Sequence, residues 1–172
     1  MEMMKALKLS ALILVSGFAT AGTNQIGAGY AHTSGDGAKL NGGALSYAYE
    51  FDNQWQISSH VTLTGATDEY KVEGYKVKET DGYGSVTVGA GYRINDYIAP
   101  FVEVGAARVG VKVESKELDE SITDHASGVA YTVGARVYPV KNWFVDVAYQ
   151  GAHIGKDVGQ LNSFIIGGGY SF

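Results

Sequence analysis

The sequence predicts an all-β fold, an eight-stranded antiparallel up-and-down β-barrel whose strands cross a membrane. Three observations support this prediction. Apolar and polar residues alternate with a period of two in about eight segments, short and long connectors follow one another in turn, and a secretory leader precedes them all.

The leader is the first element, and we place it at residues 1–21. Lys5 and Lys8 precede an apolar run that is too short to span a membrane as a helix, and a small-x-small signal peptidase site ends at Ala21. We therefore expect the β-barrel domain to cover residues 22–172.

The composition of the chain narrows its class. It has 24 Gly, 12 Tyr and only 2 Pro, which favours strands and turns over helices. Cys is absent, which excludes a disulfide scaffold, and the net charge of −5 argues against nucleic acid as a partner.

The first four predicted strands each place apolar residues on one face. A lipid-facing strand of a membrane barrel has this alternation, since every second side chain meets hydrocarbon. The apolar faces hold Ile26, Ala28 and Tyr30; Leu45, Tyr47, Tyr49 and Phe51; Trp55, Ile57, Val61 and Leu63; and Val86, Val88, Ala90, Tyr92 and Ile94.

The last four predicted strands repeat the pattern. Their opposite faces carry mainly Gly, Ser, Thr and Ala with isolated charges, whereas a soluble barrel such as a lipocalin would turn a face dense in Lys and Glu to water. The apolar faces hold Val102, Val104 and Ala106; Val129, Tyr131, Val133, Ala135 and Val137; Trp143, Val145, Val147 and Tyr149; and Phe164, Ile166, Tyr170 and Phe172.

The connectors orient the predicted barrel. Short turns are expected at residues 52–54, 95–96 and 139–142, and long loops at residues 32–40, 65–82, 112–127 and 151–160. Outer-membrane barrels place short turns in the periplasm and long loops outside, so both termini are expected on the periplasmic side. An aromatic girdle is expected beside the short turns, formed by Tyr49, Phe51, Trp55, Tyr92, Tyr97, Trp143, Tyr170 and Phe172.

Four stretches of the chain resemble the Ail/Lom (OmpX-type) family of small outer-membrane barrels. They are YGSVTVGAGYRIND at residues 83–96, LSYAYEF at 45–51, FVDVAYQ at 144–150 and the ending GGGYSF at 167–172. The resemblance implies a Gram-negative outer-membrane protein without a cofactor or a characteristic enzymatic activity. It also implies that the assembly machinery recognises the terminal aromatic residues Tyr170 and Phe172, and that adhesion, invasion or serum resistance are candidate roles.

Five charged residues are predicted to project into the lumen. They are Glu50, Arg93, Glu103, Arg136 and Asp146. Such charges would form an ion or proton path, or a salt-bridged plug. We favour the plug, because eight strands leave room only for side chains and an unpaired buried charge is costly.

A Ser–His pair would be needed for a hydrolase, and the sequence offers a poor one. Ser59 and His60 are neighbours on a strand and point to opposite faces, while Ser58 shares with His60 a lumen that admits no lipid. His60 is therefore expected to be a packed histidine. No carboxylate partner is assignable to His32, His125 or His153, and no metal site is predicted.

The long loops are expected to hold any binding specificity. Residues 69–79 read EYKVEGYKVKE, which predicts a hairpin tip at Gly74 and, with the alternating residues 109–114, a ribbon of sheet above the membrane. The ribbon would bind a partner strand along its edge, or would be a solvated variable loop. Its candidate contact residues are Tyr70, Lys71, Tyr75, Lys76 and Lys78, although the acidic excess of both loops disfavours polyanions.

The sequence thus predicts a monomeric surface interaction protein of the outer membrane that acts through residues 65–82 and 112–127. Its expected partners are outer-membrane lipid and lipopolysaccharide, the outer-membrane assembly machinery, and host-surface or serum proteins. The alternatives are a structural protein or small pore without a specific ligand and, more distantly, a lipid A-modifying enzyme.

Overall fold

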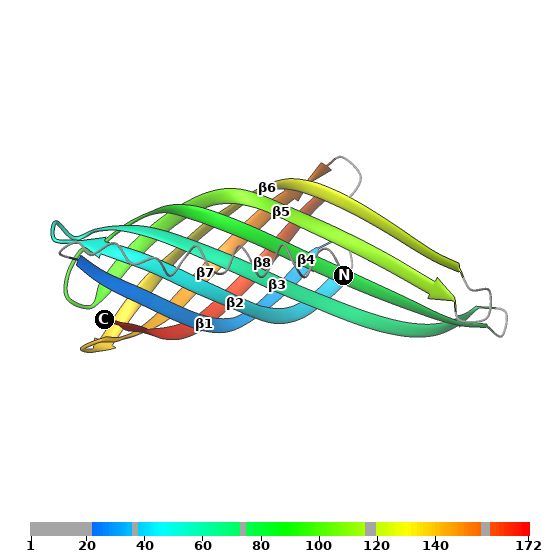
Figure 1. Cartoon of the computed structure of the whole chain (residues 1–172), viewed down its shortest axis with the longest axis horizontal. Coiled ribbons are helices and arrows are strands. Elements are labelled where there is room, and N and C mark those ends of the chain that lie inside the picture. Colours follow the sequence, from blue (N-terminus) through cyan, green and yellow to red (C-terminus); the bar gives the residue numbers. More distant parts are fainter. Residues whose placement is uncertain (1–21, 36–37, 73–74, 116–119, 156–158) are drawn as a thin grey trace.

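The computed structural model describes residues 22–35, 38–72, 75–115, 120–155 and 159–172. The expected signal peptide, residues 1–21, lies outside them. Eight strands form a closed barrel in which each strand pairs antiparallel with its sequence neighbours (Figure 1). The strands are β1 (Gly22–Gly35), β2 (Ala38–Phe51), β3 (Trp55–Val72), β4 (Tyr75–Tyr92), β5 (Ile98–Ser115), β6 (Glu120–Val140), β7 (Trp143–Ile154) and β8 (Gly159–Ser171).

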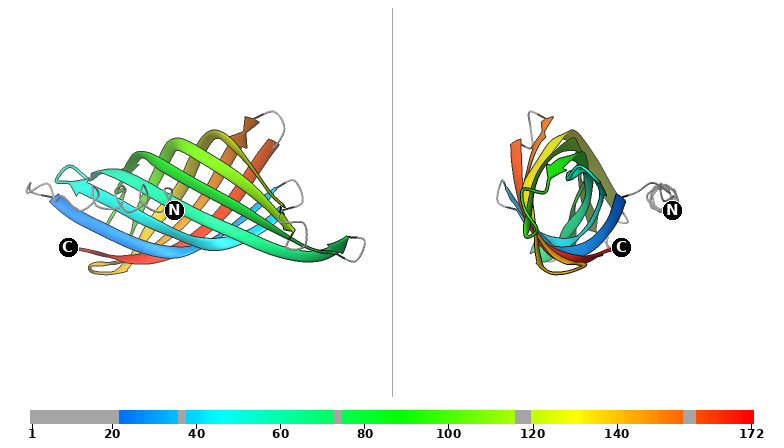
Figure 2. Two further views of the ribbon diagram at one scale, coloured as in Figure 1. Left: turned by 45° about the vertical axis from the view of Figure 1, so that its right-hand side comes forward. Right: turned by 90° about the vertical axis from the view of Figure 1, so that its left-hand side faces the viewer.

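The barrel closes where β8 pairs with β1, as the sequence predicts. Ile26 lies opposite Tyr170, and Asn24 and Phe172 exchange two backbone hydrogen bonds of 2.9 and 2.8 Å at the end of this seam. The ring is seen end-on in Figure 2. Since hydrocarbon offers no hydrogen-bond partner, closure satisfies backbone groups that would otherwise be exposed at an edge.

The two faces of the strands are those that the alternation predicts. Large apolar side chains cover the outside, where Val104 and Val129 are each 65% exposed to the surroundings. The predicted girdle is present near the short turns, with Trp55 against Tyr92 and Trp143 against Tyr170 at ring distances of 5.2 and 5.3 Å. The described residues include no helix long and apolar enough to span a membrane.

The four segments predicted as long loops are mostly strand. For residues 69–79 and 109–114 this agrees with the predicted ribbon of sheet, whereas the other predicted loop residues extend the strands beyond their predicted ends. The pairs Gly35–Ala38, Val72–Tyr75, Ser115–Glu120 and Ile154–Gly159 continue the ladders to within a few residues of each hairpin tip. These stretches keep strand-forming Val, Thr and Tyr and contain no Pro, so the ladder runs on into water.

The turn predicted at residues 139–142 is also shorter than expected. Only Lys141 and Asn142 separate β6 from β7, and Asn142 has a positive φ of 68°, which Asn tolerates better than most residues. Pro139 lies in β6 where the register shifts between Val137 and Val140, and such an irregularity accommodates a residue without an N–H. The turn at residues 52–54 is as predicted.

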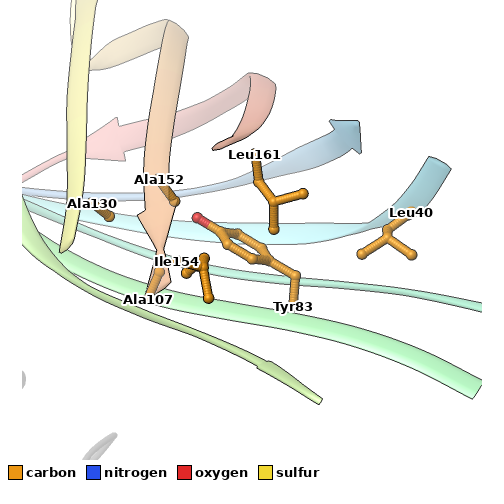
Figure 3. Close-up of a cluster of buried hydrophobic side chains, with 7 residues drawn as sticks. All are labelled: Leu40, Tyr83, Ala107, Ala130, Ala152, Ile154 and Leu161. Carbon is orange, nitrogen blue, oxygen red and sulfur yellow. The ribbon is translucent and has the colours of Figure 1, made fainter. Parts of the chain in front are cut away.

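The lumen is filled by alternating polar and apolar layers. The apolar layer nearest the long hairpins surrounds the ring of Tyr83 with Leu40, Ile154 and Leu161 (Figure 3). A middle layer combines Phe101 with Ile165, the apolar residue that interrupts the alternation of the last strand. Tyr49 is an exception to the exposed girdle, because its ring covers Gly22 and packs against Phe51.

Lumen-facing glycines of this barrel sit where neighbouring strands approach closely. A Cβ added at Gly105 would lie 1.9 Å from the carbonyl oxygen of Val86, whereas one at the outward-facing Gly82 would have 3.9 Å to its nearest neighbour. We expect Gly105→Ala to lower the free energy of unfolding by about 1–3 kcal/mol through overpacking. Urea titration in lipid vesicles, followed by gel mobility, measures this. Gly82→Ala is the matched control, and equal unfolding midpoints for the two variants would contradict the prediction.

Candidate functional site

The periplasmic end of the lumen holds the first group of charges. Glu50, at the end of β2, accepts hydrogen bonds of 2.9 Å from Arg93, which follows β4. The Arg93 guanidinium lies 3.7 Å from the ring centroid of Tyr138, and Gln25 and Gln56 also donate to Glu50. This group closes the mouth of the barrel with paired charges.

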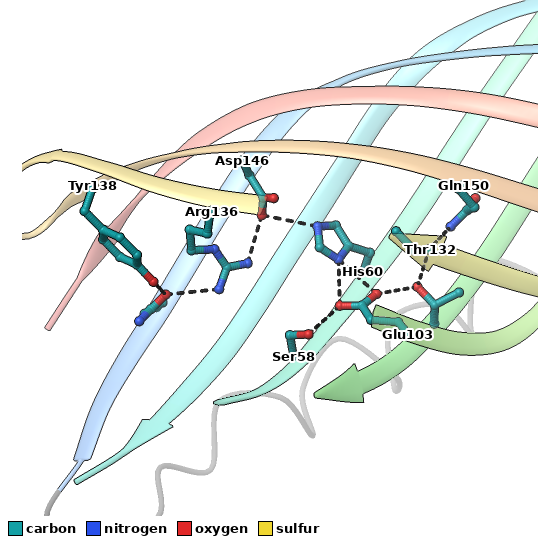
Figure 4. A network of polar contacts seen from close by, with 10 residues as sticks. Ser58, His60, Glu103, Thr132, Arg136, Tyr138, Asp146 and Gln150 are labelled. Carbon is teal, nitrogen blue, oxygen red and sulfur yellow. Dashed lines mark hydrogen bonds and ion pairs between the residues drawn. The ribbon is translucent and has the colours of Figure 1, made fainter. Parts of the chain in front are cut away.

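A second group lies deeper and spans the lumen (Figure 4). Arg136 of β6 pairs with Asp146 of β7 at 2.8 Å, and Asp146 also contacts Nε2 of His60 at 3.2 Å. The other ring nitrogen of His60 lies 3.0 Å from both carboxylate oxygens of Glu103 on β5. The five predicted lumen charges thus lie in two groups, and Glu103 reaches the others only through His60.

Gln25 bridges the two groups. Its carbonyl oxygen accepts hydrogen bonds from Arg136 at 3.0 Å and from Tyr138 at 2.9 Å. Beyond Glu103, the contacts continue through Thr87, Thr132 and Gln150 to Tyr83. A continuous network of side chains therefore runs along the described lumen.

This network has the properties of a plug rather than a conduit. Arg136 has only hydrogen-bond donors and stays charged, so it interrupts any relay in which protons hop along the chain. Arg136, His60 and Gln150 are each less than 2% exposed, so side chains occupy the space that water would need. The geometry favours the plug that the sequence predicts over an ion or proton path.

Sequence reasoning does not identify the uncharged members of this network, among them Gln25, Gln56 and Gln150, and it predicts only packing for His60. Alternation places all of them on the lumen face of their strands. The alternation of the sequence predicts which face of a strand a residue lies on. It does not predict which residue it contacts across the barrel.

The hydrolase alternative has no supporting geometry. Ser58 donates to Glu103 at 2.6 Å, and both nitrogens of His60 contact carboxylates, so no Ser–His hydrogen bond forms. His32 contacts Asn41 at 2.8 Å, and His125 and His153 are exposed. Within the described ranges, no three His, Cys, Asp or Glu residues are arranged to hold a metal ion.

The extracellular end carries the second candidate site, a four-stranded sheet that we call the ribbon. It consists of residues 65–72, 75–82, 110–115 and 120–125 of β3, β4, β5 and β6, and it extends beyond the other four strands (Figure 1). Pairing of β2 with β3 ends at Asn41–Gly65, and pairing of β6 with β7 ends at Gly128–Ile154. Both edges of the ribbon therefore lack a strand partner among the described residues.

The predicted contact residues lie on this ribbon. Lys71 pairs with Lys76 and Val72 with Tyr75, so the backbone forms the predicted hairpin. The side chains of Tyr70, Lys71, Tyr75 and Lys76 lie outside the part of the chain whose side chains are described, and Lys78 is half-buried.

Charges are separated between the two faces of the ribbon. Following the alternation from buried Tyr83, the face continuous with the lumen carries acids, and the face continuous with the barrel exterior carries cationic or titratable nitrogens. Among described side chains, the first set is Asp68, Glu79, Asp81 and Asp124. The second is Lys78, Lys112 and His125, and Arg108 lies on the same face just below the ribbon. The acids of both loops whose side chains are described thus lie on one face.

Asp81 lies in an unfavourable electrostatic environment. Burial, together with the nearby charges of Glu79 and Asp68, raises its pKa above the ordinary value. Its Oδ1 is buried without a hydrogen-bond partner, and Asp68 lies directly opposite Glu79. Like charges directly opposite one another weaken a pair of strands, so the acidic face makes ribbon stability sensitive to pH.

Comparison with known proteins places this architecture in a family. A family model described as the outer membrane protein β-barrel domain matches residues 8–172. The chain belongs to the OmpX/Ail family of outer-membrane β-barrel proteins. It is a surface protein of the outer membrane, as predicted.

Several members of the OmpX/Ail family match over nearly the whole chain. The attachment invasion locus protein of Yersinia pseudotuberculosis is 32% identical, with 99% of this chain and 98% of the relative covered. The virulence membrane protein PagC of Salmonella typhimurium is 31% identical, covering 98% and 97%, and outer membrane protein X of Escherichia coli K12 is 31% identical, covering 99% and 100%.

A solved structure of the family agrees with this barrel. The crystal structure of Ail from Yersinia pestis, in complex with the heparin analogue sucrose octasulfate, has a TM-score of 0.79 and 28% identity. The match covers 89% of this chain and all of that one. The fold class predicted from the sequence is confirmed.

Removal of Arg136 should destabilise the barrel without opening it. Arg136→Ala removes the cation that pairs with the buried Asp146, which is expected to lower the free energy of unfolding by about 3–5 kcal/mol. Urea titration measures the loss, and planar-bilayer recording tests for conductance. Arg108→Ala, on the exposed exterior, is the control and should change stability little. A stable pore in the unmodified protein would contradict the plug.

Acidification should strengthen the ribbon. Because the pKa of Asp81 is raised in the folded state, its contribution is most favourable at low pH and is lost as pH rises through that folded value. Hydrogen exchange of residues 66–68 and 79–82, corrected for intrinsic rates, should show more protection near the ordinary carboxyl pKa, at about pH 4, than at pH 7. Asp81→Asn should raise protection at pH 7 and reduce the difference, whereas Asp96→Asn in a periplasmic turn should do neither.

Proposed function

We propose that the protein attaches the bacterial surface to other cells or to serum proteins through the ribbon. The observation that carries this proposal is the pair of unpartnered strand edges, residues 66–72 of β3 and residues 120–127 of β6, held above the membrane by a rigid barrel. The lumen is filled, so the described structure provides no comparable site inside the barrel.

An exposed edge is suited to β-augmentation. Backbone N–H and C=O groups of an extended partner segment would continue the ladder, and the side chains flanking the edge would provide specificity. Soluble proteins usually block such edges, because they also invite aggregation. A ribbon that leaves two of them open supports a role in binding extended protein segments.

Sulfated or otherwise anionic glycans are a second class of partner. The exposed side chains of Lys112 and His125 lie on the exterior face of the ribbon, and Arg108 lies on the same face of β5 just below it, apart from the described acids. One relative has been crystallised with a heparin analogue, and others carry names that refer to attachment, invasion and virulence. This face supports glycan binding here despite the acidic composition of the loops.

The other predicted roles have less support. A pore is disfavoured by the packed lumen, and lipid A modification lacks a catalytic arrangement among the described side chains. We propose that outer-membrane lipid surrounds the exposed apolar band of the barrel. We also propose that the protein acts as a monomer without a cofactor or enzymatic activity.

Trimming the ribbon tests the proposal. In one replacement, Asn-Gly takes the place of residues 66–81 and joins the paired Gly65 and Gly82. In the other, Asn-Gly takes the place of residues 111–124 and joins the paired Gly110 and His125. Both replacements preserve the strand register. Bacteria that express the trimmed barrel should attach to epithelial cells, and survive serum, no better than bacteria without the protein.

The control is Asp36→Asn in the β1–β2 connection, which leaves the ribbon intact and should keep full attachment. Enzymatic removal of sulfated glycans from the host cells separates the two partner classes, since it would abolish glycan binding and spare β-augmentation. Unchanged attachment and survival with a correctly assembled trimmed barrel would refute the proposal.

A further inference from the structure

His60 occupies an unusual position for a histidine inside a membrane barrel. It is 1% exposed, its ring stacks on Phe101 at 5.2 Å, and both of its nitrogens contact carboxylates (Figure 4). Nδ1 lies 3.0 Å from Oε1 and Oε2 of Glu103, and Nε2 lies 3.2 Å from Oδ2 of Asp146.

Both carboxylates already act as acceptors. Asp146 Oδ2 receives a hydrogen bond from Arg136, and the two oxygens of Glu103 receive hydroxyl hydrogens from Ser58 and Thr87 at 2.6 Å each. A neutral imidazole has one donor and one acceptor nitrogen. In this site a neutral ring would direct a lone pair at a carboxylate oxygen, whereas an imidazolium donates to both sides.

The charge balance leads to the same state. The groups that face His60 are Glu103 from β5 and Asp146 from β7, and Arg136 of β6 pairs with Asp146. With His60 protonated, two positive and two negative charges balance. With His60 neutral, one uncompensated negative charge would remain in the lumen, which is strongly unfavourable at this depth.

We propose that closure of the barrel traps one proton on His60, and that the resulting imidazolium joins β3 to β5 and β7 across the lumen. An unperturbed histidine, with a pKa of about 6.5, is mostly neutral at pH 8. Folding at that pH therefore takes one proton from the solvent. This inference concerns assembly and is independent of the proposed binding role of the ribbon.

Nitrogen NMR of the folded protein tests the charge state directly. In micelles or nanodiscs at pH 8, a long-range spectrum of imidazole nitrogens should show both nitrogens of His60 with imidazolium shifts. Free histidine titrated in the same buffer supplies the reference shifts of neutral and charged rings. A neutral tautomer at His60 would overturn the proposal, and this measurement needs no variant that folds.

The proton balance of folding is the second test. Between pH 7.5 and 8.5, the folding equilibrium constant of the unmodified protein should fall by up to about tenfold more than that of His60→Gln, which corresponds to one proton per chain. His153→Gln should keep the behaviour of the unmodified protein, because His153 is exposed. Equal pH dependence of the unmodified protein and His60→Gln would refute proton uptake at this residue.

Discussion

The structure depends on the requirement that every backbone N–H and C=O in hydrocarbon be paired within the protein. Eight antiparallel strands meet this requirement only because β8 returns to β1, with Ile26 opposite Tyr170 and a final backbone pair between Asn24 and Phe172. The mean hydropathy of the chain, −0.04, is compatible with a membrane location for the same reason. Only every second residue of a strand meets lipid, so polar and apolar residues alternate and cancel in the average.

Closure with eight strands also determines what the lumen contains. The interior is too narrow for a water channel and must be filled by side chains, among which any charge needs a partner. Near the periplasmic mouth Glu50 pairs with Arg93, and deeper in the lumen the charged groups around His60 pair with one another. Neighbouring strands are already joined by backbone hydrogen bonds. The contacts of His60 add links between strands that are not neighbours, and these brace the ring from within.

How much of this could be predicted differs between the surface and the interior. Alternation identified the strands, the lipid-facing residues and the lumen-facing charges, because the side-chain period of two is a local property. It could not pair Glu103 with His60, since contacts across the lumen depend on how the tilted strands are staggered around the ring. The sequence overestimates the lengths of the loops for a related reason. Polar composition marks where lipid ends, but strand pairing continues into water until the backbone turns at Val72–Tyr75 or Ser115–Glu120.

The continuity of β3 to β6 from barrel to ribbon has a mechanical consequence. A partner that pulls on the ribbon pulls along the strand axes, so the load acts on the perpendicular inter-strand hydrogen bonds of the barrel together and in shear, rather than opening them one at a time. The β1–β8 seam lies on the opposite side of the ring from β4 and β5 and is the part of the barrel least affected by such a force. The fold is therefore suited to bear tension between two surfaces.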